Sequence, residues 1–261
     1  MKRVKEAASS NVRQLVSEEE WQVRVDLAAC YRLVHHHRMT DLVYTHLTAR
    51  VPGPEHHFLI NRYGLLFNEI TASNLVKIDE EGRVVGGGAD EENVVNYAGF
   101  VIHGAVHMGR PDVGCVLHVH TRASMAVSAL ECGLLPITQT AMRFFAHLGY
   151  HDYEGPALDL AERARLVADL GSHNAMILRN HGLLACGATV AEAFNMLYWL
   201  ERACDAQVAA MSCGSKLRVP SDEVAAKTAH LYDPGTRRRF GLLEWPAMLR
   251  HVDAIDPSYR S

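Results

Sequence analysis

The 261-residue chain lacks an uninterrupted apolar run long enough to cross a bilayer, and its opening residues, MKRVKEAASSNVRQLVSEEE, contain no apolar core of the signal-peptide kind. None of the six cysteines forms a C-x-x-C pair, and most lie in apolar contexts such as GCVLH and LLACG. Buried, reduced thiols are therefore expected. These absences predict a cytoplasmic protein that has no membrane partner.

The chain also lacks a large net charge, an internal repeat and a low-complexity tract. Its formal net charge is -4 and its pI is about 6.5, so no global charge favours nucleic acid as a partner. A composition of 48% hydrophobic and 21% charged residues is typical of a globular domain with a sizeable core. The residue that the chain has in unusual number is histidine, with 16 copies.

Local patterns predict a polar lead-in over residues 1–16 and one domain over residues 17–261. Ser17 and Glu20 form a capping box at the start of a helix predicted over 18–36. The HHH run that ends this helix is interpreted as ordinary helix-terminal histidines, because consecutive helical residues face different directions. Three strands are predicted next, in LVYTHLTARV, HHFLIN and NLVKIDEEGRVV, the last with a turn over 80–82.

Helices and strands alternate beyond the glycines at 86–88. Helices are predicted in VVNYAGFVIHGAVHMGR, TRASMAVSAL and DLAERARLVADLG, and strands in VGCVLHVH, AMILRN and GLLACG. A second capping box, Thr189 with Glu192, opens a long helix predicted to reach Cys213, and a helical extension punctuated by Pro234 and Pro246 follows from about residue 215. The fold class expected is α/β, a three-layer α/β/α sandwich around a mainly antiparallel sheet.

Three histidines are candidate metal ligands. His118 and His120 lie two apart on a predicted strand and therefore on one face of it. His181 follows another strand and precedes a glycine that is expected to let the backbone turn sharply. Three imidazoles could hold Zn²⁺, Fe²⁺, Mn²⁺ or Co²⁺ and leave positions open for a substrate. The alternative is ordinary strand histidines.

Two segments that carry these histidines, RPDVGCVLHVHTRASMAVSALECGLLPI and LRNHGLLACGATVAEAF, resemble the class II aldolase/adducin family. The segment PEHHFLINRYGLLFNEITASNLVKID resembles the adducin-like branch of that family, and the resemblance spans roughly residues 19–214. It implies the α/β/α sandwich, a small-molecule substrate, and a homo-oligomer that is commonly a tetramer. It also implies one divalent metal ion per chain, bound by His118, His120 and His181.

The chain departs from the sugar-phosphate aldolases of this family at the catalytic glutamate. The matching position holds Gly99, which cannot transfer a proton, so the usual retro-aldol mechanism is in doubt. The positions that match the phosphate pocket are also altered: three of the six carry aromatic or imidazole rings, and only Gly64 keeps the family residue. Such rings suit a flat or apolar substrate without phosphate. The candidate substrate-binding residues of this region are His46, Tyr63, Gly64 and Tyr97.

Other residues must then supply the acid or base. Some aldolases of the family use a tyrosine from the stretch that here reads TQTAMRFFAHLGYHDYEG, in which Arg143 could bind a carboxylate and His147 could transfer a proton. Both could equally be surface residues. His103, one helical turn beyond Gly99, is the other catalytic candidate, with packing beside the metal site as its alternative.

Three functions fit these features. The first is a metal-dependent lyase with Zn²⁺ or Mn²⁺ that cleaves a carbon–carbon bond, by decarboxylation or modified retro-aldol chemistry, in a small hydroxy- or oxo-carboxylate. The second is a mononuclear non-heme Fe(II) oxygenase or oxidative decarboxylase of an aryl oxo-acid, similar to the aldolase-fold oxygenase of aminocoumarin biosynthesis. The third is a non-catalytic, adducin-like binding protein. The long helix from Thr189 could supply an oligomer interface or cover the sheet of its own chain.

Overall fold

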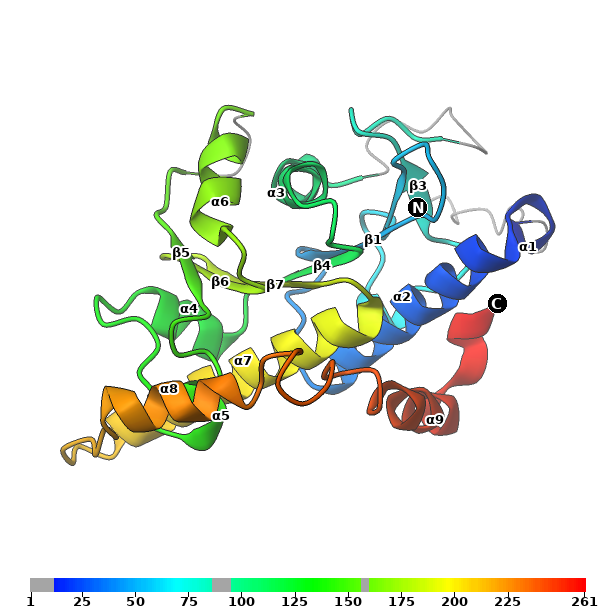
Figure 1. Cartoon of the computed structure of the whole chain (residues 1–261). Coiled ribbons are helices and arrows are strands. Elements are labelled where there is room, and N and C mark those ends of the chain that lie inside the picture. Colours follow the sequence, from blue (N-terminus) through cyan, green and yellow to red (C-terminus); the bar gives the residue numbers. More distant parts are fainter. Residues whose placement is uncertain (1–11, 86–94, 156–159) are drawn as a thin grey trace.

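A seven-stranded sheet runs through the middle of the molecule in the order β3-β2-β1-β4-β7-β6-β5 (Figure 1). The computed structural model describes residues 12–85, 95–155 and 160–261. Within this part of the chain, β5 and β6 are parallel and every other neighbouring pair is antiparallel. The predicted sheet, central and mainly antiparallel, is confirmed.

The strands are short. They are β1 His46–Arg50, β2 Phe58–Ile60, β3 Val76–Ile78, β4 Cys115–Val119, β5 Gly149–His151, β6 Ala175–Leu178 and β7 Gly182–Gly187. The α-helices are α1 Val12–Leu15, α2 Glu18–His36, α3 Tyr97–Gly109, α4 Arg122–Ser128, α5 Gln139–Met142, α6 Glu162–Leu170, α7 Val190–Ser212, α8 Asp222–His230 and α9 Trp245–Ile255. Two 3₁₀ turns complete the list, η1 Phe67–Glu69 and η2 Pro257–Arg260.

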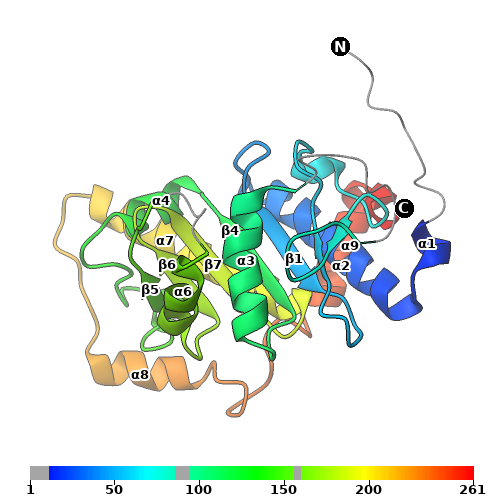
Figure 2. The same ribbon diagram turned by 90° about the horizontal axis from the view of Figure 1, so that it is seen from above.

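Helices cover both faces of the sheet. Helices α3 and α6 lie on one face, and α2 and α7 lie on the other (Figures 1 and 2). Alternate strand residues face the two layers. In β4, Leu117 and Val119 belong to the core formed with α2 and α7, whereas Val116 belongs to the core formed with α3 and α6. The three-layer α/β/α sandwich expected from the sequence is therefore present.

Both predicted capping boxes cap their helices. The Ser17 side chain accepts a hydrogen bond from the Glu20 backbone N–H at 3.1 Å, and that of Thr189 accepts one from Glu192 at 3.3 Å. Each bond satisfies a backbone donor that the first helical turn leaves free. Helix α2 spans the predicted 18–36, and α7 ends one residue before the predicted Cys213.

Three predictions about elements need correction. The strand predicted over 42–51 begins only at His46, because Thr45 has a φ of +62°, which extended strand backbone does not adopt. No strand is predicted at β5, which pairs in parallel with β6. Pro246 lies in the first turn of α9, where proline is tolerated, and so it starts this helix instead of interrupting it. The predicted lead-in over 1–16 and the helix start near 94 fall partly outside the described residues.

The apolar face of α7 packs on the chain's own sheet. Phe194, Leu197 and Leu200 are buried in the core that α7 shares with α2 and the strands. Of the two alternatives for this helix, the structure supports coverage of its own sheet. The C-terminal extension also packs on the domain, since the Trp245 indole N–H donates to Asp26 Oδ1 in α2 at 2.9 Å.

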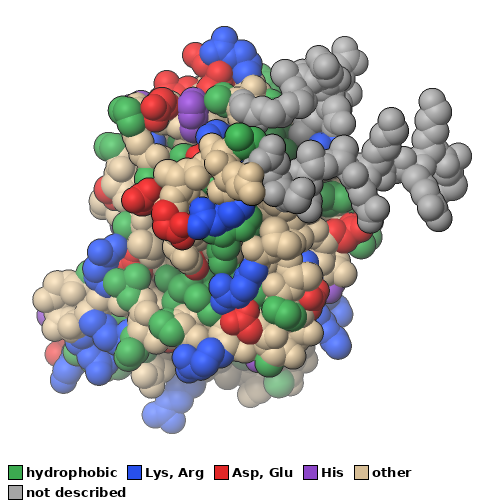
Figure 3. Space-filling model, turned by 90° about the vertical axis from the view of Figure 1, so that its right-hand side faces the viewer, with side chains coloured by type: hydrophobic (Ala, Val, Ile, Leu, Met, Phe, Trp, Pro, Cys, Tyr) green, Lys and Arg blue, Asp and Glu red, His purple; other side chains and the backbone are tan. Residues whose placement is uncertain are grey.

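The described surface is mixed in character. On the face shown in Figure 3, acidic and basic side chains are interspersed with apolar ones. Four cysteines are buried as free thiols and two are exposed, namely Cys132 and Cys213. Among the described residues, no helix is both long and apolar enough to cross a membrane.

Candidate metal centre

His118 and His120 turn toward each other where β4 ends. His118 Nδ1 lies 2.9 Å from the Leu183 carbonyl oxygen, and His120 Nδ1 lies 3.1 Å from Asp41 Oδ2. Because both partners only accept hydrogen bonds, each Nδ1 carries the proton and each Nε2 presents a lone pair. The two Nε2 atoms are 2.8 Å apart. The predicted placement of both histidines on one side of the strand holds.

His181 completes the group from the turn between β6 and β7. Its ring centroid is 4.7 Å from those of both His118 and His120, and the three ligand atoms lie within 4.8 Å of one another. The expected sharp turn at Gly182 is wrong. The left-handed residue is Asn180, with φ +55°, while Gly182 lies in β7, where an added Cβ would be 2.3 Å from the Val119 carbonyl oxygen.

The donors fit a divalent metal ion. Two lone pairs at 2.8 Å repel unless a cation or a proton lies between them, and nitrogens bound to one ion by bonds of about 2.1 Å lie roughly 3 Å apart. Burial and the neighbouring imidazoles lower the pKa of His118 well below its usual range and that of His181 to about 4. At neutral pH both rings are therefore uncharged, which is the form that binds metal.

The ring of His46 occupies the space above Gly99. A Cβ added to Gly99 in α3 would lie 2.7 Å from three atoms of this ring, Cγ, Cδ2 and Nδ1. His46 is directly opposite His118 in the pairing of β1 with β4, and their ring centroids are 5.6 Å apart. The absence of a glutamate side chain at position 99 is thus matched by an imidazole that fills its place beside the three histidines.

A second group of histidines lies behind His46. The Thr48 hydroxyl is 2.8 Å from His103 Nδ1 and 2.8 Å from His107 Nε2. His103 is 1% exposed and its ring centroid is 6.5 Å from that of His118, so it is a buried neighbour of the site. Both nitrogens of His46 and one each of His103 and His107 are buried without a partner among the described residues.

The other candidates near Gly99 lie at the same ends of the strands as the three histidines. Tyr63 and Gly64 follow β2, whose Ile60 pairs with Thr48 near the His46 end of β1. Tyr97 begins α3, two residues before Gly99. Tyr63 and Tyr97 are 38% and 50% exposed, so their rings are available to a molecule that approaches this edge.

Arg143 and His147 do not lie at these strand ends in the same chain. They line a cavity together with His173, Asn174 and Cys186, which lie where β6 begins and β7 ends. His181 lies at the opposite ends of those two strands. The structure therefore separates these two candidates from the three histidines by the length of the strands, about 16 Å for a strand of this size.

Glu201 of α7 is a buried carboxylate that the sequence did not single out. Its Oε2 accepts a hydrogen bond of 2.6 Å from the hydroxyl of Thr121, the residue after His120 and the N-cap of α4. Burial raises the pKa of Glu201 to about 7. An acidic residue about three turns inside an amphipathic helix gives no signal in the sequence, so only the packing of α7 on α4 reveals it.

The fold and the three-histidine site define an aldolase-like, metal-dependent type of α/β/α sandwich. The family described as Class II Aldolase and Adducin N-terminal domain matches residues 25–208. The chain belongs to this family. Its membership, predicted from the two histidine motifs, is thereby confirmed.

Three similar proteins illustrate the range of the family. A provisionally named class 2 aldolase of Pseudomonas aeruginosa is 48% identical over 96% of this chain and 96% of its own length. Rat alpha-adducin is 38% identical over 89% of this chain, which corresponds to 33% of the adducin. The solved L-fuculose 1-phosphate aldolase of Glaciozyma antarctica is 28% identical, with a TM-score of 0.81 and coverage of 100% and 97% of the two chains.

Proposed function

We propose that the chain is a metal-dependent lyase that breaks a carbon–carbon bond, by decarboxylation or a modified retro-aldol step, in a small hydroxy- or oxo-carboxylate without phosphate. The observation that carries this proposal is the convergence of three imidazoles, His118, His120 and His181, where β4 ends and β7 begins. A divalent ion held there would polarise a hydroxyl or carbonyl oxygen of the substrate and stabilise the negative charge that develops on it.

In this proposal His46 takes the place that the glutamate has in sugar-phosphate aldolases and hydrogen-bonds the substrate. Burial lowers the pKa of His46 to about 3, so its ring is neutral, with one N–H that can donate a hydrogen bond and one lone pair that can accept one. Neither nitrogen has a partner among the described residues, and the ring lies against Gly99. His103, bonded to Thr48, would then hold its own ring beside His46, at a centroid distance of 4.3 Å, and not touch the substrate.

Two tyrosine rings at the same strand ends support the proposal that the substrate carries no phosphate. Tyr63 and Tyr97 offer exposed aromatic faces at positions where the aldolases that this chain resembles bind phosphate. By analogy with the family, we also propose that the chain acts in the cytoplasm as a homo-oligomer, with a tetramer as the expected form.

One observation favours a second candidate. The proposed donor set is entirely imidazole, and the position that could add a carboxylate holds Gly99. Neutral donors with open positions also suit Fe²⁺ in an oxygenase that acts on an aryl oxo-acid. The likeness to alpha-adducin supports a third candidate, a non-catalytic binding protein.

The test is the metal content of freshly purified protein, measured by elemental mass spectrometry. Three proteins are compared: the wild type, His118→Ala/His120→Ala, and a matched double variant, His35→Ala/His230→Ala, whose histidines are exposed and are not among the three proposed ligands. We expect about one divalent ion per chain in the wild type and in the matched variant, and none in the first variant.

Each result selects one candidate. Zinc or manganese, followed by release of CO₂ or a carbonyl product from hydroxy- and oxo-carboxylates, supports the lyase. Iron with O₂ uptake in the presence of aryl oxo-acids supports the oxygenase. A fully folded wild type that holds no metal in any preparation contradicts both enzymes and leaves the binding protein.

A further inference from the structure

A cavity of about 390 Å³ lies where β6 begins and β7 ends, at the strand ends opposite to those that carry the three histidines. Its wall includes Arg143, His147, His173, Tyr232 and Phe240. These residues come from the α5–β5 connection, the turn before β6 and the segment after α8. The cavity is therefore separate from the proposed metal centre and needs an explanation of its own.

Arg143 is a buried cation in this wall. It is 6% exposed, and its guanidinium lies 5.1 and 5.3 Å from the ring centroids of Tyr232 and Phe240. Nη2 donates to Asn195 Oδ1 at 2.8 Å, while Nε is buried without a partner. In the described ranges, no carboxylate forms an ion pair with it. Burial lowers the pKa of Arg143 to about 10, so it is still charged at neutral pH.

Two acidic residues in the wall have polar partners other than Arg143. Glu192 forms paired hydrogen bonds with Arg239 at 2.7 and 2.6 Å. Asp233 lies 3.2 Å from His230 Nδ1 and 3.6 Å from His147 Nε2. Arg143 thus has no direct carboxylate partner among the described residues, and burying such a charge is costly unless a counter-ion joins it.

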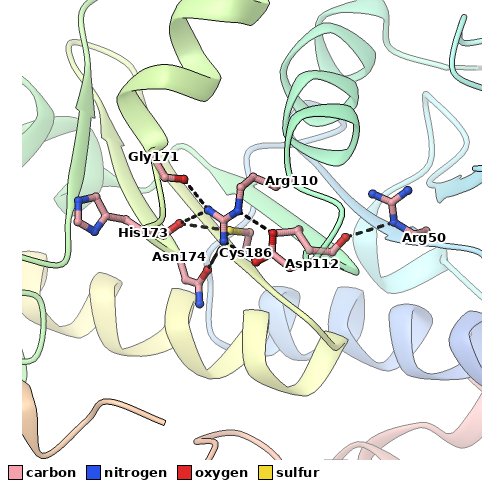
Figure 4. A network of polar contacts seen from close by, with 8 residues as sticks. Arg50, Arg110, Asp112, Gly171, His173, Asn174 and Cys186 are labelled. Atoms are coloured by element: carbon pink, nitrogen blue, oxygen red, sulfur yellow. Dashed lines mark hydrogen bonds and ion pairs between the residues drawn. The ribbon is translucent and has the colours of Figure 1, made fainter. Parts of the chain in front are cut away.

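One side of the cavity is held rigidly. Arg110 donates to the carbonyl oxygens of Gly171 and His173 at 2.7 and 3.0 Å, and it forms an ion pair with Asp112 (Figure 4). The His173 ring points away from this network in the figure. These bonds fix the turn that contributes His173 and Asn174 to the wall, so the cavity is formed before any ligand arrives.

We infer that this cavity binds a small organic monocarboxylate through Arg143, at a site distinct from the metal centre. A guanidinium presents Nε–H and one Nη–H side by side, which matches the two oxygens of a carboxylate. The rings of Phe144 and Phe240 provide an apolar wall for the body of the ligand. Phosphate has no apolar body to contact Phe144 and Phe240, so it is expected to bind more weakly.

The test is isothermal titration calorimetry of the full chain with benzoate as the probe. Benzamide, its neutral isostere, and inorganic phosphate are titrated in parallel. We expect benzoate to bind at least 10-fold more tightly than either. Arg143→Met should weaken benzoate binding by about 10- to 100-fold, since it removes the charge-assisted hydrogen bonds and retains most of the apolar side chain.

Two further variants keep the test decisive. Ser172→Trp places a bulky ring at the exposed mouth of the cavity without touching the core, and it should also abolish binding even if Arg143→Met does not fold. His118→Ala/His120→Ala should bind benzoate as the wild type does. The proposal is overturned if the wild type does not bind benzoate, if benzamide binds equally well, or if benzoate binding is lost in the metal-site variant and kept in Ser172→Trp.

Discussion

At the scale of single residues, the pair Gly99 and His46 explains how this chain departs from the aldolases it resembles. An imidazole and a side chain at position 99 cannot share the same space, because a Cβ there would lie 2.7 Å from the His46 ring. The His46 ring therefore requires a residue without a side chain at position 99. In our proposal, the polar group that lies beside the three histidines and hydrogen-bonds the substrate belongs to β1 and not to α3.

This relationship predicts a non-additive double-mutant cycle. Gly99→Ala should lower the free energy of unfolding by about 1–3 kcal/mol, as overpacking of a core does. His46→Ala should also destabilise, because it leaves a cavity. In the double variant the new methyl group meets no ring, so its cost should largely disappear. Urea unfolding of the four proteins measures the coupling, and strictly additive costs would contradict the account.

Gly104→Ala on the same helix is the matched control. An added Cβ at Gly104 would meet the Phe100 ring at 3.4 Å, which is ordinary van der Waals contact. Alanine has the higher helix propensity, so this variant should be stabilised by about 0.5–1 kcal/mol. The opposite signs at two glycines of one helix would show that contact with His46, and not helix propensity, decides the result at Gly99.

The sequence supported some residue-level predictions and not others. The H-x-H spacing on a strand determines that two imidazoles point the same way, so His118 and His120 could be predicted. The contact between His46 and Gly99 depends on the packing of α3 over β1, which no local pattern specifies. Arg143 and His147 were assigned to the substrate site from their position in a motif. Within one chain, the fold places them at the strand ends opposite to the three histidines.

At the scale of elements, strong periodicity and caps made prediction reliable, while short elements escaped it. Helices α2 and α7 have both a cap and a long apolar stripe, and their bounds agree with the sequence. Strand β5 has three residues, Gly149–His151, too few to show alternation, and it exists because β6 offers a free edge. Tertiary pairing, not local preference, creates such a strand.

The contact between helices α7 and α4 gives a pH prediction. The raised pKa of Glu201, about 7 against an ordinary 4.5, means that its contribution to stability is present below pH 4.5 and is lost as the pH rises through 7. Glu201→Gln keeps an acceptor for the Thr121 hydroxyl but does not titrate. Relative to the wild type, we expect this variant to gain about 2 kcal/mol between pH 5 and pH 8.

Urea unfolding of both proteins across that range measures the difference. All other titrating groups are shared by the two proteins, so their effects cancel in the comparison. A difference that stays constant with pH would show that the carboxylate is already charged and solvated in the folded state.

At the scale of the whole molecule, the sheet separates two chemical environments. The three imidazoles lie at the strand ends where β4 stops, and Arg143 lies at the opposite strand ends, where β7 stops. Strands of four to six residues keep the two apart. A ligand of one site can therefore leave the other unperturbed, and this is why the metal-site variant can serve as a control for the carboxylate site.

The buried histidines make the metal-free fold sensitive to acid. Burial lowers the pKa of His46 and His107 to about 3, and it lowers that of His103 well below its ordinary 6.5. A depressed pKa means that the stability is present above pH 6.5 and is lost as the pH falls, because the unfolded chain takes up the protons first. From pH 7.5 to 5.5 the three rings together should cost about 4 kcal/mol, or about 1.3 kcal/mol each.

Urea unfolding of EDTA-treated protein at the two pH values tests this. His107→Gln removes one of these titrating rings, so the loss between pH 7.5 and 5.5 should shrink by about 1.3 kcal/mol. A matched substitution of the exposed His230, which lies outside the buried group, is the control and should leave the loss unchanged. Equal losses in all three proteins would mean that acid acts elsewhere, and that the histidines behind the metal centre are not buried as neutral rings.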